Sequence, residues 1–247
     1  MTYESDHPQV ERLTSAADLA GAARLYREVF GYQDPAHSVN PRLLASLAAN
    51  GGSVVGVRGD DGALVAFAYG FVGIDGGEVY HYSQAAVVDA KHQGLGLGRA
   101  LKRGQREVAL ACGQTRMRWS FDPSVTRNAH FNLDVLGAVG RWFRADFFGL
   151  PGTDRLIVDW DLDDERRARE APAPAGLPAD LADPAGWLRP RPSGPDTWLP
   201  LPIEAGPEQR RELGAVVGGL IDDGSVATSC VVVSPSTAAY RFARVAP

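Results

Sequence analysis

The stretch "QAAVVDAKHQGLGLGRAL", Gln84–Leu101, decides the fold of this chain. Its apolar run ends at Val88, and five residues later the glycines Gly94, Gly96 and Gly98 alternate with leucines before a basic, helix-forming segment. Glycine leaves backbone N–H groups unshielded, and the N-terminus of a helix attracts anions. The stretch therefore predicts a loop that holds an anionic group, and a phosphorylated ligand is the first expectation.

Three other interpretations of the glycine loop differ in how well they fit. A dinucleotide-binding loop requires G-x-G-x-x-G directly after the strand and an acidic residue about 20 positions later. The glycine spacing here is different, although Asp122 does follow the next predicted strand. A P-loop is excluded because no Gly-Lys-Ser/Thr follows the loop. A flexible connection beside a solvated basic helix remains open.

Composition limits the class of protein without naming it. Hydrophobic residues make up 45% of the 247 residues, enough for a sizeable core, and a net charge of −5 argues against general binding to nucleic acid or membrane surfaces. The polar, acidic start shows no secretory signal, and Cys112 and Cys230 lie far apart, so we expect a cytoplasmic protein. Histidines and cysteines lack metal-ligand spacing, so no metal is predicted.

Hydrophobic periodicity predicts an alternation of helices and strands up to residue 162. Helices are expected over residues 14–31, in a short segment after Pro41, and over residues 97–112 and 128–136. Strands are expected over residues 53–74 (two strands joined at "GDDG"), 76–88, 115–122 and 154–162. Together these elements predict an α+β fold.

The composition changes after Asp164, where ten of the prolines fall between Pro172 and Pro207. Proline cannot sit inside a long helix or a central strand, so residues 165–206 are predicted to be a surface linker. A helix over residues 206–224 and two short strands, 226–233 and 239–245, are expected to close the chain. We therefore expect a main domain of residues 1–164 and a separable appendage of residues 207–247.

Gln93–Gly98 matches the Q/R-x-x-G-x-G/A signature of the GNAT superfamily of acyl-CoA N-acyltransferases, which the chain resembles from about Val10 to Leu162. The order of the elements around the loop is also similar to that family. A narrower similarity, to a bacterial branch of GNAT acetyltransferases, is carried by "HYSQAAVV", "LKRGQRE", "WSFDP", "RNAHFNLDVLGAV" and "DRLIVDWDL". The resemblance implies a GNAT fold, with a mostly antiparallel mixed sheet flanked by helices.

The resemblance also implies a ligand, acetyl-CoA or another acyl-CoA such as succinyl-CoA, with a small-molecule amine as acceptor and a homodimer as an open possibility. The pyrophosphate would lie on the glycine loop, and the pantetheine arm would pair with the backbone of the strand before it. The residues expected to bind the coenzyme are Ala86, Val87, Val88, Gln93, Gly94, Leu95, Gly96, Leu97, Gly98, Arg99 and Asn128. Lys91, Lys102, Arg103 and Arg106 add positive charge nearby.

Glu78, His81 and Ser83 on one strand are the candidates for the base that takes the amine proton. Side chains alternate along a strand, so Glu78 lies on the face opposite His81 and Ser83 unless a bulge intervenes. Many GNAT members carry a tyrosine, the acid for the departing thiolate, at the position of Leu133. Tyr80 or Tyr82 would have to replace it, or the thiolate leaves unprotonated.

Asp122, Arg127 and Asn132 form a polar cluster after the strand "RMRWSF" and are the candidates for acceptor binding. Arg127 suits a bidentate contact with the carboxylate of an amino-acid acceptor. Capping and loop hydrogen bonds are the alternative for Asp122 and Asn132. A second hypothesis is a catalytically silent CoA-binding or protein-interaction module. It is supported by Leu133, which cannot donate a proton at the position where many GNAT members carry a tyrosine.

Overall fold

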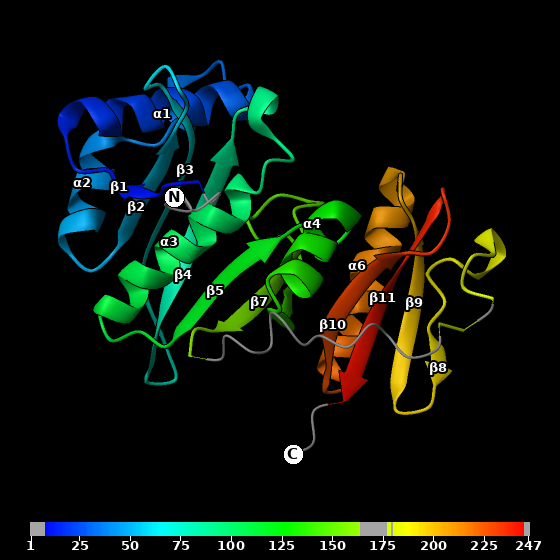
Figure 1. The fold of residues 1–247 in the computed structure, drawn as a ribbon. Helices are drawn as coiled ribbons and strands as arrows, with labels where there is room; N and C mark the ends of the chain where they lie inside the picture. The colour runs from blue at the N-terminus through cyan, green and yellow to red at the C-terminus, as the bar shows by residue number, and fades with distance from the viewer. Residues whose placement is uncertain (1–7, 164–176, 179, 245–247) are drawn as a thin grey trace, which may run out of the picture. The chain divides into compact units, whose positions relative to one another are not determined.

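The computed structural model describes residues 8–163, 177–178 and 180–244, and the chain divides into two compact units, Met1–Arg118 and Trp119–Pro247 (Figure 1). In the first unit the strands follow one another in sequence order, β1-β2-β3-β4-β5. All neighbours are antiparallel except β4 and β5, which are parallel. The strands are β1 (Glu11–Arg12), β2 (Ser53–Arg58), β3 (Leu64–Asp75), β4 (Glu78–Val88) and β5 (Arg116–Phe121), of which β5 crosses the boundary between the units.

Two hydrophobic clusters in the first unit contain alternate residues of the same strand. Val54 belongs to the cluster that contains Leu19 and Leu44, from helices α1 (Ala16–Phe30) and α2 (Pro41–Ala49). Val55 belongs to the other cluster, with Leu101 of helix α3 (Leu97–Ala111). Because successive side chains of a strand point to opposite faces, the sheet has α1 and α2 on one face and α3 on the other.

Local signals set the boundaries of helices α1 and α2 where the sequence predicts them. The Ser15 side chain accepts from the amide of Asp18 and caps α1, while Gly31 ends it with φ +66°. Asn40 caps α2 in the same way through the amide of Arg42. Such caps satisfy amides that have no acceptor inside the helix, so the boundaries are set by a few adjacent residues.

The second unit contains an antiparallel sheet with the order β7-β6-β10-β11-β9-β8. Its strands are β6 (Val139–Arg144), β7 (Arg155–Asp161), β8 (Arg191–Ser193), β9 (Asp196–Pro202), β10 (Ser225–Val232) and β11 (Thr237–Arg244). Helix α4 (Thr126–His130), which continues as a π-helical turn over Phe131–Val135, packs on β10. Helix α6 (Pro207–Asp222) packs on β6 and β10.

The structure corrects the expected division of the C-terminal part. Residues 191–202 were expected to belong to a surface linker, but they form β8 and β9, and Pro200 and Pro202 lie in β9, opposite Ala239 and Thr237 of β11. Proline is tolerated where its position needs no ladder donor, so proline content alone did not exclude a strand. The expectation of a separate appendage was also wrong, because Ala227 of β10 pairs with Gly140 of β6 and both belong to one unit. Residues 164–176 and 179 of the expected linker lie outside the described residues.

Candidate functional site

The glycine loop has a backbone that requires glycine at two positions. Gly94 has φ +82° and Gly96 has φ +76°, which is the left-handed region that other L-residues avoid. A Cβ added at either position would have no atom within 4 Å. The requirement is therefore conformational, and the space beside both glycines is open to a ligand.

Helix α3 begins directly after this loop and presents unpaired amides there. Its first hydrogen bond runs from the amide of Ala100 to the carbonyl of Gly96, at 3.1 Å. The amides of Leu97, Gly98 and Arg99 come before it and have no acceptor within the helix. These donors and the positive end of the helix dipole are suited to an anion.

Strand β4 has an edge that β5 covers only in part. Among the described residues, β4 pairs with β5 at His81 with Met117 and Tyr82 with Arg118. The register of β4 with β3 shifts at Gln84, which is an extra residue in a β-bulge. No described pairing with β5 reaches the backbone from Gln84 to Val88, where the bulge bends β4. The backbone of Ala86, Val87 and Val88, expected to meet the pantetheine arm, lies in this segment.

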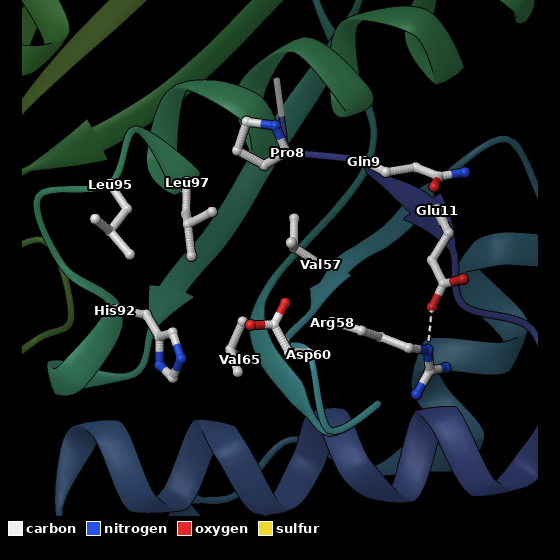
Figure 2. Close-up of a pocket in the computed structure, with 11 residues that line it drawn as sticks. Pro8, Gln9, Glu11, Val57, Arg58, Asp60, Val65, His92, Leu95 and Leu97 are labelled. Atoms are coloured by element: carbon white, nitrogen blue, oxygen red, sulfur yellow. Dashed lines mark ion pairs between the residues drawn. The ribbon is translucent and has the colours of Figure 1, made fainter. Parts of the chain in front are cut away.

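A cavity of about 410 Å³ lies beside the glycine loop, between His92, Leu95 and Leu97 and the end of β2 (Figure 2). Arg58 on its far side forms ion pairs with Glu11 and Asp18, each at 2.5 Å. Two carboxylates therefore neutralise this guanidinium, and Asp60, which also lines the cavity, adds a negative charge. The cavity is therefore a poor site for phosphate, and the loop amides are the better candidate for an anion site.

His81 is fully buried, contrary to the role of an accessible base. Its Nε2 lies 2.8 Å from Ser53 Oγ, and its Nδ1 lies 3.0 Å from Gln114 Oε1. Burial lowers the pKa of His81 to about 4; the bond to Gln114 opposes this shift and the charge of Lys102 adds to it. The imidazole is therefore neutral at physiological pH, with both ring nitrogens occupied.

Ser83 belongs to the same buried network, which the sequence did not predict. Ser83 Oγ donates to Gln105 Oε1 at 2.7 Å and accepts from Lys102 Nζ at 2.8 Å. Gln105 Nε2 donates to Ser53 Oγ at 3.0 Å, which links this group to His81. The expectation that His81 or Ser83 contacts an acceptor amine was wrong, since neither side chain is exposed by more than 3%.

Lys102 was expected among the basic residues around the coenzyme, but it is buried at 4% exposure and points to Ser83. Burial lowers the pKa of its ammonium well below the usual range. Cys112, which lies on the apolar side of the predicted helix, is exposed at the C-terminal end of α3. Helical periodicity did not show that Ser83 of β4 packs against Lys102, nor that the helix ends before Cys112.

Glu78, the third candidate base, lies at the far end of β4 from the glycine loop. It forms an ion pair with Arg118, whose guanidinium also lies 3.5 Å from Asp75 and stacks over Tyr80 at 4.2 Å. A strand rises by about 3.3 Å per residue, so Glu78 is roughly 16 Å from Ser83 along β4. Its carboxylate is engaged and remote from the bulge, which argues against a role at the thioester.

The structure does not bring the predicted acceptor cluster together in the second unit. Asp122 Oδ1 accepts from the amide and hydroxyl of Ser124, at 2.8 and 2.7 Å, and Asn132 Oδ1 accepts from Trp119 Nε1 at 3.0 Å with Asn132 buried. Arg127 and Asn128 are exposed on α4. The bonds of Asp122 Oδ1 and the buried Asn132 match the alternative of capping and loop hydrogen bonds.

A second cavity, of about 600 Å³, lies within the second unit and includes Asp122. Its charged lining residues are Asp122, Asp146, Asp154, Arg210 and Arg211. Only Asp122 was a candidate from the sequence. The others come from the β6–β7 hairpin and from α6, and no sequence signal joins segments so far apart.

Two general features of the described residues concern metal ions and membranes. Residues 8–163, 177–178 and 180–244 contain no group of three or more histidine, cysteine, aspartate or glutamate side chains that could hold a metal ion. In the same part of the chain no helix is long and apolar enough to cross a membrane.

The element order and the glycine loop before α3 match a GNAT-type fold. The GNAT acetyltransferase of Streptococcus pneumoniae superposes with a TM-score of 0.50 at 14% identity, over 62% of this chain and 98% of that protein. The ribosomal-protein-S18-alanine N-acetyltransferase of Escherichia coli gives a TM-score of 0.49 at 18% identity, over 63% and 94%. No protein-family model and no curated protein sequence matches the chain.

Proposed function

We propose that this protein is an acyl-CoA-dependent N-acyltransferase that moves an acetyl group, or another short acyl group, to the amine of a small molecule. The observation that carries the proposal is the glycine loop. The left-handed backbone at Gly94 and Gly96 and the free amides at the start of α3 suit a pyrophosphate, which needs several donors aimed in one direction.

The partly unpaired edge of β4 supports the same proposal. Amides between Gln84 and Val88 are suited to pair with the pantetheine arm, and one of them would polarise the thioester carbonyl. The amine then attacks the carbonyl carbon, the C–S bond breaks, and the thiolate departs. Leu133 is 1% exposed and carries no proton, so the thiolate leaves without an acid at that position. A thiol pKa of about 8.5 makes this a fair leaving group.

The burial of His81 and Ser83 and the ion pair of Glu78 leave the amine proton to solvent. The amine has to arrive neutral, so the rate should rise with pH toward the pKa of the acceptor. The absence of an accessible base among these three residues also favours the second candidate function, a protein that binds CoA without catalysis. The location in the cytoplasm and the homodimer remain predictions from the sequence.

Calorimetric titration with CoA tests the coenzyme site through a matched pair of variants. Gly96→Asp and Gly96→Asn have similar shape, and both new side chains tolerate a left-handed backbone better than most others do. Of the two, only the aspartate variant adds a negative charge beside the loop amides. We expect Gly96→Asp to weaken CoA binding at least tenfold more than Gly96→Asn. Equal affinity in the two variants would place the pyrophosphate elsewhere.

Release of free thiol from acetyl-CoA with a panel of amines separates the two candidate functions. An acyltransferase releases CoA at a rate that depends on the amine and saturates with it. Tight CoA binding with no amine-dependent release would establish the silent module instead.

A further inference from the structure

We infer that the cavity within Trp119–Pro247 binds a small zwitterion, a molecule with an ammonium group, a carboxylate and an apolar body. The cavity has a volume of about 600 Å³. Its lining carries both signs of charge, three aspartates and two arginines, together with the apolar side chains of Pro123, Phe143 and Pro151. A site with paired polar ends and an apolar middle selects ligands of that same pattern.

The carboxylates are held in place by backbone donors. Asp122 Oδ1 accepts from the amide of Ser124 at 2.8 Å, and Asp146 Oδ1 accepts from the amide of Gly152 at 2.9 Å. These bonds use one oxygen of each carboxylate and leave Oδ2 of Asp122 and Asp146 to accept from an ammonium. Side chains fixed before binding lose little entropy when a ligand arrives, so the arrangement is preorganised.

The two arginines come from the first turns of α6. This helix lies in residues 207–247, the segment that the sequence predicted to be an appendage. Arg210 Nε donates to the carbonyl of Ala205 at 3.0 Å, which fixes the side chain and leaves its terminal nitrogens for a second acceptor. Among the described residues, no ion pair joins Arg210 or Arg211 to the three aspartates of the cavity. Their charge is therefore available to a carboxylate, which a guanidinium binds bidentately.

Close packing of α6 on the β6–β7 hairpin brings the two charged sides together. A Cβ on Gly214 would lie 2.1 Å from Asp154 Oδ2 and 3.4 Å from the ring of Phe143. Asp154 Oδ1 in turn accepts from the amide of Asp146 at 3.0 Å. The missing side chain of Gly214 thus allows the helix with the arginines to approach the hairpin with the aspartates.

Binding of this ligand does not depend on the proposed function, so the two are tested apart. Calorimetry with the twenty L-amino acids, with and without saturating CoA, measures binding to the cavity. The tightest amino acid is then compared with its decarboxylated amine and its deaminated acid. For L-leucine these are 3-methylbutylamine and 4-methylpentanoate. We expect each analogue to bind at least tenfold more weakly, because each lacks one of the two charges.

Variants locate the site. Arg211→Gln and Asp122→Asn should each weaken binding of the amino acid about tenfold, with Arg211→Gln leaving the affinity for the decarboxylated amine unchanged. Arg189→Gln is the matched control, because Arg189 is an exposed arginine of the same unit outside the cavity. Absence of binding by every amino acid, or equal affinity in Arg211→Gln and Arg189→Gln, would overturn the inference. Failure of CoA to bind would overturn the proposed function and leave this result standing.

Discussion

Lys102 Nζ donates to Ser83 Oγ at 2.8 Å inside the first unit, where both residues are less than 5% exposed. Ser83 directly precedes Gln84, the extra residue of the bulge in β4. The bond therefore links α3, whose first amides form the proposed pyrophosphate site, to the strand segment proposed for the pantetheine arm. One buried network thus holds together both parts of the proposed coenzyme site.

Lys102→Met should remove a rise in the free energy of unfolding with pH in the neutral to alkaline range. Burial places the pKa of Lys102 well below its unfolded value, so folding favours the neutral amine. The free energy of unfolding should therefore rise as pH increases between the folded and unfolded pKa, by at most about 1.4 kcal/mol per pH unit. Urea unfolding at about pH 7 and about pH 9 measures this rise. Lys91→Met, at an exposed lysine, should retain it, and a rise that persists in Lys102→Met would assign it to another group.

His81→Gln should reduce the sensitivity of the protein to acid. The pKa of His81 is about 4 in the folded state, against about 6.5 when unfolded. The neutral imidazole therefore contributes fully to the free energy of unfolding above pH 6.5, and this contribution is lost as pH falls toward 4. Between about pH 7.5 and about pH 5, this group should cost the wild type about 2 kcal/mol of unfolding free energy. The comparison is urea unfolding of wild type, His81→Gln and the exposed control His37→Gln at both pH values. The same acid loss in all three would show that His81 is not responsible.

Gly214→Ala should destabilise the second unit, whereas Gly219→Ala in the same helix should not. The new Cβ at position 214 would overlap Asp154 Oδ2, and overpacking of this kind costs about 1–3 kcal/mol. At position 219 nothing lies within 4 Å, so alanine should add up to about 1 kcal/mol through its helix propensity. Thermal unfolding of both variants measures the difference. Similar melting temperatures would mean that α6 does not pack on the hairpin as described.

A chain that ends at Asp163 should fail to fold as a cooperative unit. It loses β10, whose Ala227 pairs with Gly140, and the bond from the Tyr240 hydroxyl to the carbonyl of Pro123, at 2.8 Å. The remaining edge of β6 is then open to aggregation. Dye binding, solubility and thermal unfolding report the outcome, with a chain shortened only by residues 245–247 as the control. A soluble shortened chain with a sharp transition would restore the separable appendage.

Much of the first unit was predictable because its signals are local. Ser15, Asn40 and Gly31 set helix ends through contacts with neighbouring residues, and the glycine loop follows from backbone conformations that only glycine adopts readily. The candidate base residues were not predictable in this way. Alternation correctly placed His81 and Ser83 on one face of β4, but the sequence did not show that α3 covers that face.

By itself the sequence determined the order of the main helices and strands of the first unit, the position of the glycine loop and the resemblance to the GNAT family. Caps, turns and periodic burial act over a few residues, so they can be recognised in short stretches of the sequence. Only the tertiary structure decided that Lys102 lies buried against Ser83, that β9 pairs with β11, and that Arg210 shares a cavity with Asp122. Each of these depends on packing between segments distant in the chain, where burial and close approach determine the chemistry of a side chain.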